Sequence, residues 1–329
     1  MERMKRGGIA RVSGVIEADL RNRETGLQLP HIKGLSDMAA SVLHCRSVNT
    51  SEIAAVLPRM VKNDDSRYRV INRWLQNPMI DPLDVMASFA GELFGQACHG
   101  GKTAVLMLDQ SKVADGFECL MVSLRLGERA LPLAWIVEET RGNIGFSGQK
   151  PLLDAIVSMV PQGCDILLTA DRFFGTAALI GWCQQAGWGY RLRLKGNLIL
   201  QHAGAEITTG DVARFAAQGI EGAELNGTGI VTSIGILHEK GHSQPWIVAM
   251  DGPPTRARVR DYGMRWGIEA LFSDFKTRGF GITTTRLCHA ERIGRLILIL
   301  AMALYFAVST AMRPDKNAPQ YTPKKPIAA

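Results

Sequence analysis

The stretch YGMRWGIEALFSDFK, from Tyr262 to Lys276, is mostly apolar, yet it carries polar and charged side chains at spacings that a helix brings to one side. An α-helix turns by about 100° per residue, so residues three, four and seven apart face the same way. Four side chains therefore fall within an arc of about 60°: those of Tyr262, Arg265, Glu269 and Lys276. The pattern predicts a helix that packs through an apolar stripe and presents a carboxylate between cations on another. A solvated face held by ion pairs is the plain alternative.

The composition indicates a globular protein. The chain has 329 residues, of which 46% are hydrophobic and 21% charged, which gives it room for roughly one to three domains. Its net charge of +7 is a modest argument for a polyanionic partner. The six cysteines include no C-x-x-C pair, so we expect free thiols in a reducing cytoplasm. The apolar run 296–312 contains small residues that suit close packing, and we expect a soluble core helix there and no membrane partner.

The periodicity of the sequence changes along the chain and divides it into segments. Residues 1–100 carry helical patterns with start signals such as Asp81-Pro82. Short apolar runs, which predict strands, begin after residue 102. We predict five segments: an N-terminal helical region (1–100), two parts of an α/β core (101–196 and 246–313), a glycine-rich, mainly β insertion lying apart from the main sheet (197–245), and a disordered tail (314–329).

Two of the apolar runs end in an acid. TAVLMLD (103–109) ends in Asp109 and CDILLTAD (164–171) ends in Asp171. Acids at strand ends point into the space above a sheet, where ligands bind. A third carboxylate there, from Glu269, would need cations to offset the repulsion. Two Mg²⁺ ions, with Mn²⁺ as an alternative, accept such oxygen ligands and clamp a phosphate when they lie about 4 Å apart. Each aspartate taken alone could equally be a turn residue.

A basic strand follows the second acid. In YRLRLKG (190–196) the cations Arg191, Arg193 and Lys195 alternate with leucines. Side chains two residues apart in a strand lie on one face, so we predict that these three contact DNA phosphates.

The spacing Tyr262-x2-Arg265-x3-Glu269-x6-Lys276 resembles the Tyr-Arg-Glu-Lys signature of a branch of bacterial insertion-sequence transposases of the DDE type. LDQSKV (108–113) is similar to the block that holds the first aspartate of this family, and ADRFFGT (170–176) is similar to the block that holds the second. The resemblance extends over about residues 100–313. The four-residue signature is specific, whereas each aspartate block alone is not.

The resemblance implies a ribonuclease-H-like core, interrupted by a mainly β insertion and preceded by a DNA-binding N-terminal region. It also implies an enzyme that cuts double-stranded DNA at the terminal inverted repeats and joins the ends to target DNA, as a homodimer on DNA in the bacterial cytoplasm, at the nucleoid. Asp109, Asp171 and Glu269 would hold the metal ions. Arg265 and Lys276 would grip phosphates, and Tyr262 would hydrogen-bond the backbone near the cut.

Two other functions and one open question remain at the level of sequence. The chain could be a nuclease or recombinase of the same fold with another role, or a DNA-binding relic of a transposase without catalysis. Some relatives stack an unpaired base on a tryptophan from the insertion while they form a DNA hairpin. Residues 197–245 contain no tryptophan, so Trp246 is the nearest candidate.

Overall fold

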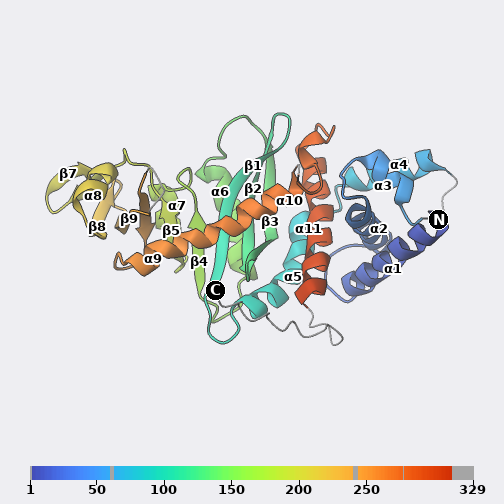
Figure 1. Ribbon diagram of the computed structural model, residues 1–329, viewed down its shortest axis with the longest axis horizontal. Coiled ribbons are helices and arrows are strands. Elements are labelled where there is room, and N and C mark those ends of the chain that lie inside the picture. The colour runs from blue at the N-terminus through green and yellow to red at the C-terminus, as the bar shows by residue number, and fades with distance from the viewer. Residues whose placement is uncertain (1, 60–62, 240–243, 277, 313–329) are drawn as a thin grey trace, which may run out of the picture.

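The structure is a computed structural model that describes residues 2–59, 63–239, 244–276 and 278–312. The described residues form one ten-stranded mixed sheet with helices packed against it, and the N-terminal helices gather at one end of the molecule (Figure 1). The predicted disorder of residues 314–329 falls outside the described part of the chain.

The helices alternate with the strands after residue 100. Before the sheet come α1 (Glu2–Arg21), α2 (Leu29–Cys45), α3 (Thr50–Val56), α4 (Asp64–Leu75) and α5 (Pro82–Ala97). The later helices are α6 (Phe146–Met159), α7 (Ala177–Gln185), α8 (Thr209–Phe215), α9 (Arg256–Asp261), the 3₁₀ turn η1 (Tyr262–Arg265), α10 (Trp266–Phe275), η2 (Ile282–Thr284) and α11 (Ala290–Met312). The strands are β1 (Ala104–Ala114), β2 (Phe117–Leu126), β3 (Arg129–Glu139), β4 (Ile166–Ala170), β5 (Gly189–Arg193), β6 (Ile199–His202), β7 (Ala205–Thr208), β8 (Gly219–Leu225), β9 (Val231–Leu237) and β10 (Trp246–Met250).

The strand order confirms the predicted fold class. The sheet runs β3-β2-β1-β4-β5-β10-β9-β8-β6-β7. The first three strands form the antiparallel meander, and β1, β4 and β5 are parallel to one another. Residues 104–108 of β1 and all of β4 are buried, as expected for parallel strands covered on both faces. This is the ribonuclease-H-like arrangement, a mixed α/β sheet flanked by helices.

The glycine-rich segment extends the sheet. Strand β10 pairs with β5 along one edge and with β9 along the other, so β6–β9 continue the same hydrogen-bonded sheet. The expectation that this segment lies apart from the main sheet is therefore wrong, because β10 offers both of its edges for pairing. The boundaries of the five segments stay a prediction.

The stretch from Tyr262 to Lys276 is not one regular helix. It begins in η1, continues as α10 and ends at Phe275, so Lys276 lies in the turn that follows the helix (φ −89°, ψ −145°). A 3₁₀ turn has about three residues per turn, which places residues i and i+3 directly over each other. Arg265 therefore lies directly over Tyr262, closer in direction than the wheel of a regular α-helix predicts.

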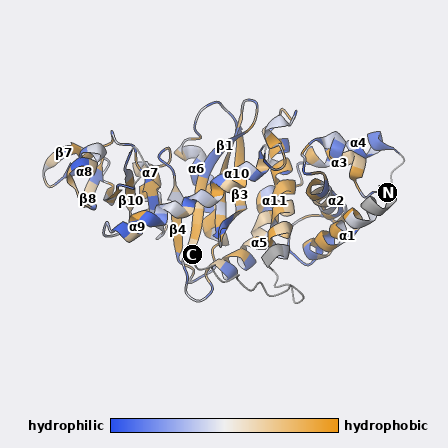
Figure 2. Cartoon of the chain, in the orientation of Figure 1, coloured by the Kyte–Doolittle hydropathy of each residue, from blue (hydrophilic) through white to orange (hydrophobic). Residues whose placement is uncertain are grey.

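The last helix completes the core. Among the described residues, one helix is long and apolar enough to cross a membrane, Ala290–Thr310 within α11. It packs against β3 and α2, and Figure 2 shows its apolar residues continuing those of the central strands. Arg295 within it is buried and donates to the backbone oxygens of Leu75 and Ile80, which ties α11 to the N-terminal helices.

Two cysteines are joined in the structure. Cys98, after α5, forms a disulfide with Cys164, before β4, and the four other cysteines are free. The expectation of six free thiols is thus wrong for this pair. The fold brings the end of α5 next to the start of β4, a proximity across 66 positions that sequence spacing does not reveal.

Candidate metal and DNA site

The structure places the two predicted aspartates side by side. β1 and β4 pair in parallel up to Leu108 opposite Ala170, so Asp109 and Asp171 each come one residue beyond the last paired position. The prediction that Asp109 ends its strand is wrong, because β1 continues to Ala114, paired there with β2 alone. The acids therefore lie where β1 and β4 part, at the edge of the sheet where ligands bind in α/β folds.

Helix α10 brings the third carboxylate to the same place. It packs on β1 and carries Glu269 in its first turn. Arg265, at the end of η1, lies between the two elements: its Nη1 donates to Asp109 Oδ2 at 3.0 Å, and its Nη2 donates to Glu269 Oε1. A single guanidinium thus bridges two of the three predicted metal ligands.

Burial governs the protonation of Asp109. Desolvation raises the pKa of its carboxyl to about 6, and the negative charges of Asp171 and Glu269 add to this effect. The Arg265 guanidinium and the backbone N–H of Gln110, which donates to Oδ1 at 2.9 Å, oppose it by lowering the pKa. The three acids are therefore close enough to interact, and burial makes ionisation of Asp109 less favourable than it would be in water.

Replacing Asp109 by asparagine should stabilise the metal-free protein above pH 6. The folded-state pKa of about 6 exceeds the ordinary aspartate value of 3.8, so this carboxyl contributes most to stability when it is protonated, and the contribution is lost as the pH rises from about 4 through 6. The Asp109→Asn variant should lack this loss. Its free energy of unfolding relative to the wild type should be about 1–3 kcal/mol higher at pH 8 than at pH 4.5. Urea unfolding in the presence of a chelator measures it.

The matched control for this measurement is Asp115→Asn. Asp115 is exposed, and its hydrogen bond from Lys112 lowers rather than raises its pKa. This variant should show no gain at high pH. Equal stability changes for Asp109→Asn at both pH values would contradict the burial argument.

The donor set fits a hard divalent cation, but the structure holds the donors in another arrangement. Over the described ranges, no three His, Cys, Asp or Glu side chains lie close enough together to hold a metal ion. The predicted cluster of three carboxylates is not formed in this conformation, because the guanidinium of Arg265 occupies the space between Asp109 and Glu269. Asp171 accepts a hydrogen bond from the backbone N–H of Phe173 at 2.8 Å through Oδ1. Carboxylate oxygens are the ligands that Mg²⁺ and Mn²⁺ accept.

Lys276 also reaches this edge. Its Nζ donates to the hydroxyl of Ser111 at 2.5 Å. Ser111 is two residues beyond Asp109 on β1 and shares its face of the strand, so Lys276 lies beside the carboxylate cluster. Ser111 was not predicted as a site residue, although it belongs to the LDQSKV block.

Tyr262 lies beneath Arg265. Its side chain is only 3% exposed and its hydroxyl accepts a hydrogen bond from Arg265 Nε at 3.2 Å. The ring of Trp246 meets it edge to face, 5.2 Å between centroids. This geometry suits a residue that positions Arg265; the predicted direct contact between Tyr262 and DNA stays a prediction.

Trp246 packs in the core. It is 7% exposed and forms a small buried cluster with Tyr262, Val248 and Val259. An unpaired base could not reach its face, so the expectation that Trp246 stacks a base is wrong. A tryptophan at the start of a strand covered by a helix is enclosed by residues from α9 and η1, which sequence position alone does not show.

The three predicted cations, Arg191 and Arg193 in β5 and Lys195 just after it, divide between the core and the surface. Arg191 is 5% exposed and donates to Arg258 O at 2.9 Å and to the carboxylates of Asp251 and Asp261. This burial contradicts the expectation that Arg191 contacts DNA, because the guanidinium is enclosed by α9 and its donors are used inside the fold. Arg193 and Lys195 instead line a cavity.

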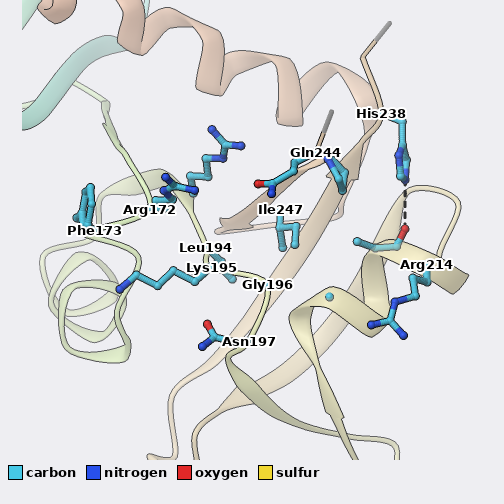
Figure 3. A pocket seen from close by; sticks show the side chains of 14 residues that line it. Arg172, Phe173, Leu194, Lys195, Gly196, Asn197, Arg214, His238, Gln244 and Ile247 are labelled. Carbon is cyan, nitrogen blue, oxygen red and sulfur yellow. Dashed lines mark hydrogen bonds between the residues drawn. The ribbon is translucent and has the colours of Figure 1, made fainter. Parts of the chain in front are cut away.

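The cavity has a volume of about 710 Å³ and lies between the loop after β4, the end of β5 and α8 (Figure 3). Its cationic and aromatic lining comes from Arg172, Phe173, Arg193, Lys195, Arg214 and His238, and it has no carboxylate. Arg214 pairs with Asp211, whereas Arg172, Arg193 and Lys195 form no ion pair with any described residue. Phe173 is 48% exposed, and Lys195 Nζ lies 5.6 Å from its ring centroid.

A glycine fixes the loop that joins the cavity to the acids. A Cβ atom at Gly175 would lie 2.1 Å from the backbone oxygen of Arg193, so only glycine allows this close approach of the loop to β5. The loop carries Asp171 at one end and Arg172 and Phe173 next to it. Sequence reasoning did not single out Arg172, Phe173 or Arg214, although the first two belong to the ADRFFGT block.

A comparison with protein families gives a match to the transposase DDE domain over residues 146–306. The matched range contains Asp171, Glu269 and the whole lining of the cavity, and Asp109 precedes it. No curated protein matches the chain. The match shows that this part of the chain is similar to the transposase DDE domain, on a ribonuclease-H-like sheet with acids at its edge.

Proposed function

We propose that the protein is the transposase of a bacterial insertion sequence, of the branch with the Tyr-Arg-Glu-Lys signature, and that it cuts the ends of its element and joins them to target DNA. The observation that carries the proposal is the cluster in which Arg265 joins Asp109 and Glu269 beside Asp171, at the edge of the sheet. Carboxylates from two neighbouring strands and one helix are the ligand set that metal-dependent phosphoryl transfer needs.

In this proposal each residue of the cluster has a defined task. Asp109, Asp171 and Glu269 would hold two Mg²⁺ ions, with Mn²⁺ as an alternative, which would supply Lewis-acid stabilisation of charge during phosphoryl transfer. Lys276, held by Ser111, offers its ammonium to a phosphate beside the cut. Arg265 offers a planar fork that matches a phosphate in two-point contact.

The remaining parts of the chain would bind and orient DNA. Residues 1–100 would recognise the terminal inverted repeats, and α4 offers exposed Arg69 and Arg73 for phosphates, whereas Arg67 is buried and pairs with Asp64. The catalytic core would comprise residues 101–196 and 246–313, and residues 197–245 would add the α8 wall of the cavity. The active form would be a homodimer on double-stranded DNA, in the cytoplasm at the nucleoid.

The cavity suits an unpaired nucleotide pulled from the duplex near the cut. Its volume lies within the range of about 300–1,000 Å³ common for small-molecule sites. Arg193 and Lys195 would bind the flanking phosphates, and exposed Phe173 offers a face for a base. Phe173 is two residues from Asp171, so a strand held at the acids would extend directly into the cavity. We therefore assign the stacking task of a hairpin route to Phe173.

The Phe173→Ala variant should slow the hairpin step about tenfold, because base stacking on an aromatic ring contributes about 1–3 kcal/mol. Denaturing gels of a labelled element end, sampled through the reaction, show the hairpin as a transient species of about twice the strand length. The matched control is Phe215→Ala, which removes an exposed phenylalanine at the end of α8 outside the cavity lining. Equal effects of the two variants, or strand release without any hairpin, would rule out this role.

The activity itself is tested with purified protein, Mg²⁺ and DNA that carries the sequences flanking its gene on both sides. Cutting at the ends of inverted repeats in those sequences, followed by joining of the cut ends to a plasmid, is the expected result. Cutting without preference for the repeats would indicate a nuclease of another role. Repeat binding without cutting in either Mg²⁺ or Mn²⁺ would indicate a relic without catalysis.

A further inference from the structure

All three nitrogen atoms of the Arg265 guanidinium donate hydrogen bonds within the site. Nη1 donates to Asp109, Nη2 to Glu269 and Nε to the hydroxyl of Tyr262. The side chain is 9% exposed, and its guanidinium carbon lies 5.7 Å from the centroid of the Tyr262 ring. The fork is therefore fixed in one orientation by three partners from β1, η1 and α10.

This position conflicts with the binding of metal ions. Mg²⁺ draws its ligands to about 2.0–2.1 Å, and two ions need oxygen atoms from both carboxylates. Here one oxygen of Asp109 and one of Glu269 already accept hydrogen bonds from the same guanidinium, whose planar fork fills the space between them. In this geometry the metal ions would have to compete with the guanidinium for one oxygen of each carboxylate.

We propose that Arg265 is a latch: without DNA it takes the place of the metal ions between Asp109 and Glu269, and a DNA phosphate releases it. The proposal rests on the proposed function, since it concerns the same carboxylates. A DNA phosphodiester is an equally good two-point partner for the fork and carries the same single negative charge as a carboxylate. When Arg265 exchanges a carboxylate pair for a phosphate, the acids become free for metal.

The latch makes metal binding and DNA binding cooperative. DNA draws Arg265 away from the carboxylates, and metal ions bind more readily once Arg265 has left. Each ligand should therefore raise the affinity of the other by the same factor. The protein without DNA would then bind metal weakly, which keeps a nuclease centre inactive until an element end is in place.

The test uses Mn²⁺ as the probe, with free Mn²⁺ measured by electron paramagnetic resonance during titration of the full chain without DNA. Arg265→Lys keeps the charge but lacks the planar fork that reaches Asp109 and Glu269 at once, so it should hold the two carboxylates less firmly and bind Mn²⁺ at least about tenfold more tightly than the wild type. Tyr262→Phe removes the third partner of the guanidinium and should show a smaller gain in the same direction. The two variants offer independent routes to the same result if one of them folds poorly.

The control for charge is Lys276→Gln. It removes a positive charge beside the cluster that touches Ser111 and bridges no carboxylates, so its gain in Mn²⁺ affinity should be less than that of Arg265→Lys. In the second arm, a duplex ending in the terminal repeat should raise Mn²⁺ affinity more in the wild type than in Arg265→Lys.

Three results would overturn the latch, and the third would also overturn the proposed metal site. Equal Mn²⁺ affinity of the wild type and Arg265→Lys without DNA, or an equal gain in Lys276→Gln, removes the latch and leaves the metal site intact. Absence of Mn²⁺ binding in every variant, with and without DNA, removes the latch because the proposed metal site itself is then wrong.

Discussion

The Asp171→Asn variant should lose at least about a thousandfold of the rate of metal-dependent end cleavage, about 4 kcal/mol of transition-state stabilisation, while it binds end DNA about as well as the wild type. Asparagine keeps the size of the side chain and an oxygen that can accept the N–H of Phe173. It removes the negative charge that a bridging metal ion requires. The loss should therefore be catalytic, with little change in the fold.

Asp171 is the most direct of the three acids to test. Asp109 is buried and contacts Arg265, and Glu269 contacts Arg265 as well, so substitutions there change the latch together with the metal site. Asp109→Asn and Glu269→Gln should nevertheless abolish cleavage to a similar extent, since the three effects concern one unit and do not add. Cleavage is measured on a labelled duplex in Mg²⁺ and again in Mn²⁺.

The matched control is Asp165→Asn. Asp165 lies at the opposite end of β4 and is exposed; its backbone oxygen accepts from Ala104, which the substitution leaves unchanged. This variant should cleave at the wild-type rate. Retention of near-wild-type cleavage by Asp171→Asn would show that the ligand set is assigned incorrectly.

Much of the sheet was predictable because the decisive signals are local. The apolar runs before Asp109 and Asp171 were confirmed as strands, and the structure adds that these strands are parallel neighbours. Short runs of buried aliphatic residues with turn residues between them carry this information by themselves.

The arrangement of the stretch from Tyr262 to Lys276 could be predicted only in part. A helical wheel assumes one uniform rotation, but the chain tightens into η1 before α10 and leaves the helix at Lys276. The departure decides the chemistry: a 3₁₀ turn places Arg265 over Tyr262, and the turn at Lys276 lets its side chain reach Ser111. Whether a helix begins as a 3₁₀ turn depends on packing against distant strands, which local sequence does not record.

The cavity could not be predicted from the sequence either. Its walls come from the loop after β4, the end of β5, α8 and the start of β10, and only the continuous ten-stranded sheet brings them together. Sequence reasoning recognised the alternation of cations in β5. It could not tell which of these positions is covered by α9 and which lines the cavity.

Arg191 is buried and Arg193 lines the cavity, so the two alanine variants should differ: Arg191→Ala should lose stability, and Arg193→Ala should lose DNA affinity. Arg191 has four hydrogen-bond contacts inside the fold: to the backbone oxygens of Tyr190 and Arg258, and to the carboxylates of Asp251 and Asp261. Its removal would leave buried acceptors without donors and a void under α9. Both aspartates are more than a third exposed, so water compensates for part of the loss.

We therefore expect Arg191→Ala to lower the free energy of unfolding by about 2–3 kcal/mol, with DNA affinity reduced only as far as the protein unfolds. Arg193→Ala, two residues along the same strand, should change stability by less than about 1 kcal/mol, since Arg193 pairs with no described acid. It should instead weaken DNA binding and reduce the salt dependence by about one unit of log-log slope, the mark of one lost phosphate contact. Urea unfolding and binding titrations at several salt concentrations separate the two outcomes. If the Arg191→Ala protein were stable and showed a reduced salt slope, Arg191 would contact DNA after all. Its ion pairs with Asp251 and Asp261 would then break when DNA binds.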